Sequence, residues 1–537
     1  MPGWKFREGR IFAFIDLGTN SARLLLVRLN PNGSHTVLSD QKEPVRLGEG
    51  EFNGRSVLQE EAMQRTVRVV TNFVEMARLY NAEEILAVAT SATREAENQA
   101  EFLRMMKRSA HIDLRVISGR EEARLTYLGV ANGVDLGGKQ AVFIDIGGGS
   151  TELIVGDAAK YDFLDSLKLG AIRVTSTLLP SGSEQPILPT QYEAIKEYIR
   201  NLSVRTVQRV REFKTDLAYG SSGTIENLAD ISAHMFLKRA RQRDDVLTLA
   251  HLRLVMRHLC SLPVDLRRQV QGINPYRADI IIGGGAILEA LMETAKLKQM
   301  NISSRGLRDG LLFDSLVLSG LTAETGSVRE RSVLQLGRSC SFDEVHARHV
   351  TELALKLFDS GRTAGLHSMG SWERELLEHT SMLHDIGSFL SYSNHEQHTH
   401  YLIRNADLLG FNQDEIKLMA ETALFHRRAL PSRDKYPDYA ALDRNARQLV
   451  KQLAIFLRIA ESADRSHAGA VAEARFTSRS GGKAVLEIIP RRNCELEIWG
   501  IQNHRSTFKK VFGHSLQIEV VEKGLAHKTK HESPRIY

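Results

Sequence analysis

Apolar runs that end in glycine-rich polar turns recur along the first half of the chain. The clearest is an apolar run at 141–144, a turn at 145–152 with the sequence D-I-G-G-G-S-T-E, and a second apolar run at 153–155. This pattern predicts a strand, a tight turn and a second strand. Three consecutive glycines let backbone N–H groups approach an anion closely, because no Cβ intervenes. Asp145 and Glu152, at the two ends of the turn, are carboxylates suited to a hard cation such as Mg²⁺.

A similar arrangement lies near the start of the chain. An apolar run at 11–17 contains Asp16 near its end, a polar turn follows at 18–21, and a second apolar run begins at 24. In both copies an aspartate stands near the end of the first strand, where turn amides and hydroxyls could hold a phosphate. The alternative is two unrelated hairpins, but the matching Asp, Gly and Ser or Thr positions favour a shared ligand.

Later stretches are predicted to repeat this theme. Residues 217–224 and 280–286 each predict a strand that enters a turn of small residues, and an apolar helix is expected to follow at 287–295. A further strand and turn are predicted at 167–173. Strands whose glycine turns converge, interleaved with helices, predict an α/β fold with a ligand between two halves.

Between the first two turns, residues 58–80 predict a helix and residues 85–89 a short buried strand. Hydroxyl residues at 90–93 then predict a helix start. Arg94 lies one turn inside that helix, where its guanidinium fork suits phosphate oxygens. A solvated surface arginine is the alternative.

The next helix begins near Ser118 and carries two consecutive glutamates. Ser118 and Glu121 have the spacing of a capping box, which predicts that Glu121 is occupied at its own helix terminus. Glu122 is left free. A carboxylate beside a bound polyphosphate can orient and deprotonate an attacking water, so Glu122 is a candidate general base.

Composition places the chain among ordinary globular proteins. Its 537 residues, 42% hydrophobic and 25% charged, predict roughly two to four domains. No apolar run approaches the roughly 20 residues of a membrane span, and the start lacks a secretory signal, so we expect a cytoplasmic protein with no membrane partner. Three widely spaced cysteines argue against a disulfide framework. A net charge of +6 is consistent with a polyanionic partner.

Six ordered motifs resemble the exopolyphosphatase and guanosine pentaphosphate phosphohydrolase family, within the actin-like ATPase-domain superfamily. The match covers about residues 9–320 and, less firmly, the remainder. The motifs are D-L-G-T-N-S-A-R at 16–23, A-T-S-A-T-R-E-A-E-N at 89–98, S-G-R-E-E-A-R-L at 118–125, D-I-G-G-G-S-T-E at 145–152, G-S-S-G-T at 220–224 and I-I-G-G-G at 281–285.

The resemblance implies an α/β fold of two actin-like, ribonuclease H-like lobes with a cleft between them, at 1–130 and 131–320. An all-α HD-type domain is expected at 321–480, and a small basic α/β subdomain at 481–537. The implied activity is Mg²⁺-dependent removal of the terminal phosphate from linear inorganic polyphosphate, with water as acceptor.

The family's functional positions fall on residues of the motifs. Its general base falls on Glu122, its metal-associated carboxylates on Asp145 and Glu152 with Asp16 as a helper, and its basic position on Arg94. Its phosphate-cradling positions fall on Thr19, Asn20, Gly147, Gly148, Ser150, Gly223 and Thr224.

The motifs leave alternatives open. Guanosine pentaphosphate 5′-phosphohydrolase is the close one, because the site motifs do not separate the two substrates. More distant are an actin-like ATPase or sugar kinase and a non-catalytic sensor of polyphosphate or an alarmone. The resemblance also implies a homodimer, leaves a monovalent cation open and gives no specific nucleic-acid partner.

The second half differs in composition, since 14 of the 19 histidines lie after residue 320. Residues 321–330 are predicted to be a linker, and the helices after it resemble the HD pattern of the family's C-terminal part. Imidazole and carboxylate ligands on several helices are what a mono- or di-metal site requires. A second divalent metal is then expected at His346, His384, Asp385, His398, His426 and Asp464.

Two interpretations of this domain stay open. An intact His384–Asp385 pair could bind metal and hydrolyse a nucleotide phosphate. Alternatively, the domain is a degenerate module that binds polyphosphate or dimerises, which is favoured because the family's chemistry lies in its first half. Beyond it, alternating residues in 481–537 predict a small antiparallel sheet, with 496–499 as one strand. Its basic residues could line a path for a polyanion, and they are Lys509, Lys510, Lys523, Lys528 and Lys530.

Overall fold

The computed structural model of the chain describes residues 9–52, 56–179, 185–318, 326–427, 431–480 and 482–521. It divides into two compact units, Met1–Arg329 and Glu330–Tyr537, each of which is described by itself. Among the described residues, no helix is both long enough and apolar enough to cross a bilayer.

The first lobe of the first unit is built on a five-stranded sheet with the order β3-β2-β1-β4-β5. β1 (Arg10–Leu17) pairs antiparallel with β2 (Ser21–Leu29), which pairs antiparallel with β3 (His35–Pro44). β4 (Glu84–Ala89) pairs parallel with both β1 and β5 (Arg115–Val116). The hairpin turn of 18–20 therefore stands beside the end of β4, where the short helix α2 (Ser91–Glu95) begins.

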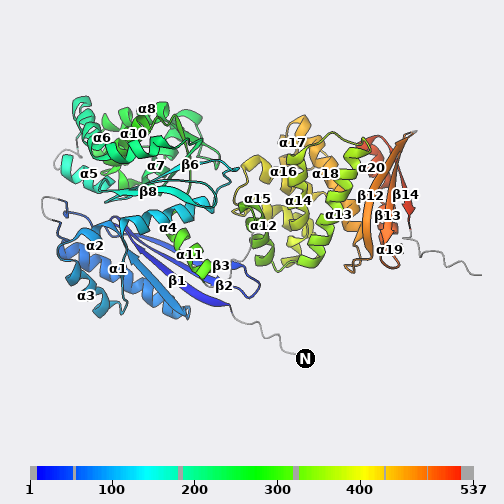
Figure 1. Ribbon diagram of the computed structural model, residues 1–537, viewed down its shortest axis with the longest axis horizontal. Helices are drawn as coiled ribbons and strands as arrows, with labels where there is room; N and C mark the ends of the chain where they lie inside the picture. Colours follow the sequence, from blue (N-terminus) through cyan, green and yellow to red (C-terminus); the bar gives the residue numbers. More distant parts are fainter. Residues whose placement is uncertain are drawn as a thin grey trace, which may run out of the picture. The chain divides into compact units, whose positions relative to one another are not determined.

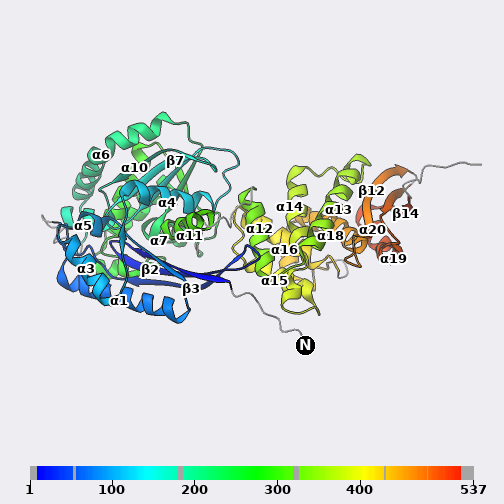
Figure 2. The ribbon, with the colours of Figure 1, turned by 60° about the horizontal axis from the view of Figure 1, so that its bottom comes forward.

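Both faces of this sheet are buried, which is why β1 is an unbroken apolar run rather than an alternating one. Ala13 and Ile15 pack toward α1 (Glu60–Leu79) and α3 (Gln99–Ser109). Phe12 and Phe14 pack toward α4 (Gly119–Ala131) and α11 (Leu307–Leu318). Figure 2 shows α1 on one side of β2 and β3, and α4 and α11 on the other.

The second lobe repeats this arrangement in a six-stranded sheet with the order β10-β11-β9-β6-β7-β8. Three strands form an antiparallel meander, and they are β6 (Ala141–Ile146), β7 (Thr151–Gly156) and β8 (Tyr161–Leu167). β9 (Leu217–Ser221) pairs parallel with β6 and β11 (Gln299–Ile302), and β10 (Val246–Thr248) closes the edge antiparallel to β11. The predicted recurrence of strand, turn and strand thus corresponds to two similar sheets.

Helix α4 lies between the two sheets (Figure 1). Its Leu125 belongs to the core around Phe12 and Phe14 of the first sheet, and its Ala123 and Tyr127 belong to the core around Phe143 of the second. A helix buried on two faces has a fixed position relative to both lobes. The glutamates of its first turn are therefore held at the junction of the lobes.

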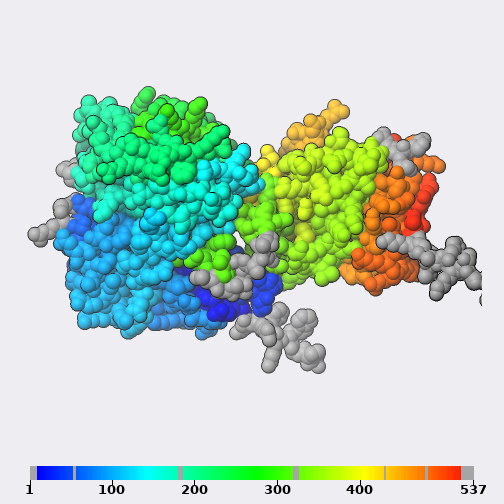
Figure 3. Space-filling model, in the orientation of Figure 1, coloured from blue at the N-terminus to red at the C-terminus, as the bar shows by residue number. Residues whose placement is uncertain are grey.

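Helix α11 returns to the first lobe, although the sequence boundaries assign it to the second. Leu311 and Leu312 pack with β1, and Asp314 accepts a hydrogen bond from Arg124 of α4 at 3.0 Å. Figure 3 shows the green atoms of α11 among the blue atoms of the first lobe. The first lobe therefore needs a segment that follows the second lobe in the sequence.

The prediction of a strand and glycine turn at 280–286 is wrong. Ile280 is the N-cap and residues 281–286 lie inside one helix, α10 (Ile281–Thr294), whose glycines allow close packing. A Cβ on Gly283 would lie 2.5 Å from Thr175 Oγ1, and one on Gly284 would lie 2.4 Å from Thr224 Cγ2. The three glycines thus resemble the phosphate turns in sequence while serving helix packing.

The prediction at 167–173 also needs correction. The strand lies earlier, as β8, and a helix rather than a turn begins at Ala171, α5 (Ala171–Leu178). The lobe is completed by α6 (Pro189–Glu212), α7 (Ser222–Ser232) and α8 (Leu249–Cys260), which pack with α10 against β6 and β7.

The second unit is largely helical and has one continuous apolar core. Its principal helices are α13 (Glu344–Thr363), α14 (Ser371–Leu383), α15 (His395–Asn405), α16 (Gln413–Leu424) and α18 (Arg444–Ala463). Of the linker predicted at 321–330, residues 321–325 lie outside the described residues, and helix α12 (Val328–Ser339) already begins within it.

The small sheet at the end of the chain differs from the prediction. It starts before residue 481, with β12 (Val471–Ser480), and its order is β12-β13-β14. β13 (Lys483–Pro490) is antiparallel to β12 but parallel to β14 (Ser515–Val520), because two helices connect β13 to β14. Residues 496–499 lie in the first of these, α19 (Glu495–Gln502), and not in a strand.

The second connecting helix, α20 (Arg505–Phe512), carries Lys509 and Lys510, which are exposed. Lys523, Lys528 and Lys530 lie outside the described residues.

Candidate active site

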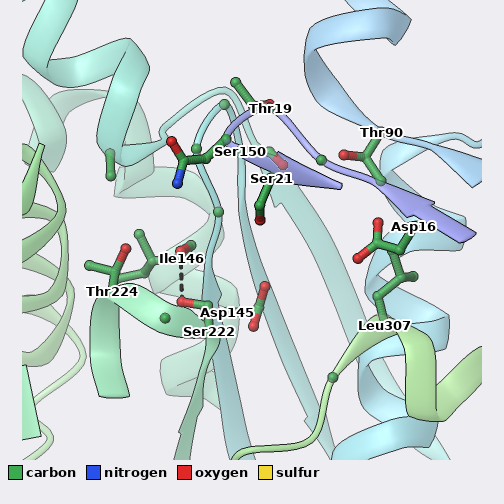
Figure 4. A pocket seen from close by; sticks show the side chains of 18 of the residues that line it. Asp16, Thr19, Ser21, Thr90, Asp145, Ile146, Ser150, Ser222, Thr224 and Leu307 are labelled. Carbon is green, nitrogen blue, oxygen red and sulfur yellow. Dashed lines mark hydrogen bonds between the residues drawn. The ribbon is translucent and has the colours of Figure 1, made fainter. Parts of the chain in front are cut away.

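A cavity between the two lobes is lined by the turns that the sequence predicts to bind phosphate (Figure 4). Thr19 and Ser150 lie near one another at one end of it, while Asp16 and Thr224 lie on opposite sides. Every predicted phosphate-binding residue lines this cavity: Thr19, Asn20, Gly147, Gly148, Ser150, Gly223 and Thr224.

The turn at 147–150 is shaped by the N-terminus of α5. The backbone N–H groups of Ala171 and Ile172 donate to the carbonyl oxygens of Gly147 and Gly148, each at 2.9 Å. This turn also contacts the first lobe, because a Cβ on Gly148 would lie only 2.9 Å from Thr19 Cβ. Glycine therefore permits the two turns to approach one another and line the same cavity.

Glu122 lines the cavity from the first turn of α4. Its Oε2 accepts a hydrogen bond from Arg94 Nη1 at 2.8 Å, and the same nitrogen donates to the Ile117 carbonyl at 3.0 Å. Arg94 does not itself line the cavity. In this structure the Arg94 Nη1 group is directed at Glu122, and the contact of Arg94 with phosphate oxygens stays a prediction.

The capping argument for Glu121 is right about the backbone and wrong about the side chain. Ser118 Oγ accepts a hydrogen bond from the Glu121 N–H at 3.1 Å. The Glu121 carboxylate instead accepts two hydrogen bonds from Arg124, at 2.8 and 2.9 Å, and Arg124 also reaches Asp314. Glu121 is thus engaged away from the cavity, and Glu122 is the member of the pair that lines it.

Three more carboxylates gather around Glu122. Asp16 and Asp145 line the cavity, whereas Glu152 lies behind it and accepts a hydrogen bond from Ser166 Oγ at 2.8 Å. Burial raises the pKa of Glu122 to about 7, with the Arg94 charge acting in the opposite direction. Burial also raises the pKa of Asp16 and of Asp145, and burial together with the charges of Glu122 and Asp145 raises that of Glu152.

This group of carboxylates fits a hard divalent cation. Asp16 Oδ1 is buried and has no hydrogen-bond partner in the part of the chain that the structure describes. Carboxylate oxygens are the ligands that Mg²⁺ prefers, and its charge would offset the mutual repulsion of the four side chains. Asp16 and Asp145 face the cavity and are the direct candidates, with Glu152 beside Asp145 across the β6–β7 pair.

Sequence reasoning missed four charged residues that line the cavity: Arg23, Glu226, Arg277 and Arg305. Arg277 is 8% exposed, and burial lowers its pKa to about 10. Within the described residues, neither the Arg23 nor the Arg277 guanidinium donates a hydrogen bond or forms an ion pair. Arg23 ends the first motif and pairs with Asp16 across the hairpin, so its position could be predicted from the sequence. Arg277 lies outside the six motifs, four residues before I-I-G-G-G at 281–285.

Ser222, also missed, has a backbone conformation that side-chain-bearing residues rarely adopt, with φ of 85°. Its Oγ donates to the Ile146 carbonyl at 2.7 Å, while Ser221 Oγ donates to the Asp145 carboxylate. Strained residues of this kind cluster at functional sites, where the surrounding structure holds them. The strand end at Ser221 is thereby tied to the end of β6.

Arg173 of α5 joins the two lobes at the edge of the cavity. Its Nε donates to the Gly149 carbonyl at 2.8 Å, and its Nη2 lies 3.0 Å from Glu95 Oε1 of α2. The guanidinium also lies over the Phe52 ring, 4.1 Å from its centroid. One side chain thus connects the glycine turn of the second lobe to the helix that carries Arg94.

Two family models match the chain over most of its length. The model of the Ppx/GppA phosphatase family matches residues 26–318, and that of Ppx/GppA phosphatase domain III matches residues 328–492. This chain belongs to the Ppx/GppA phosphatase family. It is therefore a phosphohydrolase, as the motifs predict, and the predicted fold of two actin-like lobes, a helical region and a small β-containing subdomain is confirmed.

Two solved structures are similar to this Ppx/GppA phosphatase. One is an exopolyphosphatase from Cytophaga hutchinsonii, with 24% identity over 59% of this chain and 100% of that chain, and a TM-score of 0.53. The other is an exopolyphosphatase-like protein, with 26% identity over 57% of this chain and 98% of that chain, and a TM-score of 0.52.

The second unit of this Ppx/GppA phosphatase brings most of the predicted metal ligands together. His346, His384 and Asp385 offer ligand atoms within 4.8 Å of one another, and so do Asp385, His395 and His426. Asp464 contacts His346 Nδ1 at 2.8 Å. The assignment of the domain to the HD type stays a prediction.

One predicted ligand of this cluster is misplaced and another was missed. His398 joins neither group and packs against Gly387, where a Cβ would lie 2.8 Å from His398 Cβ. His395, at the start of the same helix, takes its place. The missed residue is Glu461, whose carboxylate contacts both His346 and His384. It lies on α18 one turn before Asp464, outside the His and Asp pattern used to search the sequence.

Proposed function

We propose that the cleft of the first unit is an exopolyphosphatase site, which hydrolyses the terminal phosphoanhydride bond of linear inorganic polyphosphate. The observation that carries this proposal is the placement of Glu122. It is a buried carboxylate, hydrogen-bonded to Arg94, in a cavity walled by two glycine turns. Hydrolysis of a phosphoanhydride requires positioning, charge stabilisation and a base near the attacking water, and little covalent chemistry.

In the proposed reaction, the turns around Thr19 and Ser150 bind the terminal phosphate, and Glu122 accepts a proton from a water in line with the leaving oxygen. The water oxygen forms a bond to phosphorus while the bridging P–O bond breaks. The electron pair of the broken bond leaves with the bridging oxygen on the shortened chain. Bound Mg²⁺, held by Asp16 and Asp145, would supply charge neutralisation to the phosphate oxygens. Arg94 stabilises the ionised form of Glu122.

Polyphosphate is favoured as substrate by the charges and by the lack of aromatic rings in the described lining of the cavity. The guanidinium groups of Arg23 and Arg277 line the cavity without protein partners among the described residues, as expected for ligands of an extended anion. Among the residues that the structure describes, no aromatic side chain lines the cavity, so no aromatic ring there would stack on guanine.

Guanosine pentaphosphate is the second candidate, and Glu226 is the observation that favours it. Its carboxylate lines the same cavity beside Arg277. A carboxylate can accept hydrogen bonds from the guanine amine or a ribose hydroxyl, whereas an ionised polyphosphate offers no donor. If the protein hydrolyses guanosine pentaphosphate and leaves guanosine tetraphosphate intact, Glu226 is the residue expected to accept these hydrogen bonds from the nucleoside.

The proposal is tested by supplying polyphosphate and guanosine pentaphosphate separately in ¹⁸O-labelled water, with Mg²⁺ or with a chelator. The expected product from polyphosphate is orthophosphate carrying one ¹⁸O atom, formed only with Mg²⁺. Release from guanosine pentaphosphate alone would instead support the second candidate. A tight ATP complex, with phosphoryl transfer to an acceptor and no labelled orthophosphate, would support the kinase alternative.

From the family resemblance we further propose a homodimer located in the cytoplasm. Sedimentation equilibrium of the full chain tests the oligomeric state, and a single species at the monomer mass would contradict it.

A further inference from the structure

The centre of the histidine cluster in the second unit is occupied by a carboxylate that the sequence pattern does not include. Glu461 Oε2 lies 3.1 Å from His346 Nε2 and 3.0 Å from His384 Nε2. All three side chains are buried in the core of the unit. The Nε2 atoms of both imidazoles thus contact the same carboxylate oxygen.

The distances from Glu461 Oε2 to the two imidazole nitrogens are compatible with ligands on one cation. Ligands bound at about 2.1 Å are separated by roughly 3.0 Å when they meet at right angles and by roughly 3.4 Å when they meet at the tetrahedral angle. The separations of Glu461 Oε2 from His346 Nε2 and from His384 Nε2 fall in this range, and ligand atoms of the two histidines lie within 4.8 Å of one another.

The opposite ring nitrogens show which face of each imidazole is available. His384 Nδ1 contacts the Ser381 carbonyl at 2.7 Å, and His426 Nδ1 contacts the Ala423 carbonyl at 2.6 Å. A carbonyl only accepts, so in each ring Nδ1 carries a proton and Nε2 is the atom turned to the centre, where a bound cation would take the place of any proton on it. This is the ring orientation that metal-binding histidines adopt, with an outer acceptor on Nδ1 that fixes the ring.

Asp464 plays that outer role for His346. Its Oδ2 lies 2.8 Å from His346 Nδ1, on the side of the ring away from Glu461, and its Oδ1 accepts from the Gly469 N–H at 2.8 Å. Both oxygens of Asp464 are therefore engaged outside the centre. The sequence pattern instead predicts that Asp464 binds the metal directly.

Asp385 connects this trio to a second one. Its Oδ1 lies 2.8 Å from His395 Nε2 and 3.7 Å from His426 Nε2, and those two nitrogens are 3.3 Å apart. The same Oδ1 is buried and lacks a hydrogen bond of good geometry among the described residues. His395 Nδ1 contacts the Tyr392 carbonyl at 3.0 Å, so its Nε2 is also turned to the centre.

We propose that the second unit binds two divalent cations, with Glu461, His346 and His384 on the first, His395 and His426 on the second, and Asp385 shared. Asp464 is a positioning residue that orients His346 and does not touch the metal. Mixed imidazole and carboxylate ligands suit transition metals such as Zn²⁺, in contrast to the oxygen ligands of the cleft, which suit Mg²⁺.

The test uses the full chain with Zn²⁺ as the probe. The protein is loaded with Zn²⁺, dialysed against excess Mg²⁺ so that the cleft carries Mg²⁺, and its zinc content is measured. Two zinc ions per wild-type chain are expected, and Glu461→Gln is expected to lose one. Asp464→Asn is expected to keep both at saturation with a roughly 10–100-fold weaker affinity, the usual cost of removing an outer partner.

His398→Gln is the matched control, because His398 belongs to the sequence pattern and to the same helix as His395 but to neither trio. It should retain two zinc ions at wild-type affinity. Zinc-free wild-type protein, or loss of zinc from Asp464→Asn with retention in Glu461→Gln, would overturn the proposal.

A second measurement requires no substitution. An anomalous-difference map of zinc-loaded crystals should place one ion next to the Glu461 carboxylate. An ion bound to the Asp464 carboxylate instead would overturn the assignment, even if the Glu461 variant fails to fold.

Discussion

Arg94 and Glu122 form a 2.8 Å ion pair that joins the short helix of one motif to the first turn of another, at the wall of the cleft. The two side chains are largely buried, so the pair is weakly screened by solvent. Its function in our account is to hold ionised a carboxylate that burial alone would keep protonated. The proton affinity of Glu122 is thus set by two opposing effects that can be varied separately.

The rate of phosphate release should rise with pH through about 7. A general base must be ionised, and burial raises the pKa of Glu122 to about 7, so kcat/KM should fall below that pH and level off above it. Raising the Mg²⁺ concentration adds positive charge beside the carboxylates and should move the rising limb of the profile of kcat/KM against pH to lower pH. A profile that is flat between pH 6 and 8 at low Mg²⁺ would contradict the assignment of Glu122.

Arg94→Gln should move the rising limb of the profile of kcat/KM against pH to higher pH. The guanidinium lowers the pKa of Glu122, and its removal leaves burial and the neighbouring carboxylates unopposed. The matched control is Arg124→Gln. Arg124 lies on α4, the helix that carries Glu122, but its guanidinium pairs with Glu121 and Asp314. The control should leave the limb in place, and an equal shift in both variants would show that the ion pair is not the cause.

Arg173→Lys should loosen the contact between the lobes. A lysine keeps the charge but cannot reach the Gly149 carbonyl and Glu95 together, and losing a charged hydrogen bond costs about 1–3 kcal/mol. Amide exchange of α2 and of the turn at 147–150 should quicken, and kcat/KM should fall by roughly 10-fold or more.

Lys168→Gln is the control for Arg173, since Lys168 also pairs with Glu95 but its side chain is 75% exposed. Exposed pairs contribute about 0–1 kcal/mol, so exchange and kcat/KM should stay near wild type. Equal effects of the two substitutions would argue that any loss of charge near Glu95 is enough.

Gly284→Ala should destabilise the second lobe and disturb the phosphate site. The new Cβ would lie 2.4 Å from Thr224 Cγ2, a branched side chain on the cavity wall, and overpacking of this kind costs about 1–3 kcal/mol. Gly285→Ala meets the flexible Met256 instead, and should cost less because alanine also favours the helix. Thermal unfolding and the KM for polyphosphate measure both effects, and a more harmful Gly285 variant would contradict this packing account.

The parts of the fold that the sequence predicts are those encoded locally. The hairpins around Asp16 and Asp145 were readable because a buried strand, a glycine turn and a second strand follow one another in the chain. The glycines at 283–285 gave a wrong prediction of a turn, because the local sequence does not show that Gly283 and Gly284 face Thr175 and Thr224 from inside a helix. Local pattern could not distinguish a turn that binds a ligand from a helix that needs close packing.

The site residues divide in the same way. Glu122 was identifiable from its position after a cap, whereas the partner of Arg94 depends on where two distant helices meet. Arg277 carries no local signal, and its role follows only from burial in the cavity wall. Glu461 was missed because its relation to His346 and His384 arises from the packing of α18 against α13 and α14.

The most direct test of the account is orthophosphate release from long-chain polyphosphate by the wild-type protein, Glu122→Gln and Glu121→Gln at fixed Mg²⁺ and pH 8. Glu122→Gln keeps the shape and removes the base, so kcat should fall by about 10²–10⁴-fold, while Glu121→Gln, which faces Arg124, should stay within a few-fold of wild type. A Glu122→Gln protein that releases phosphate at the wild-type rate, or a wild-type protein that releases none, would contradict the central claim.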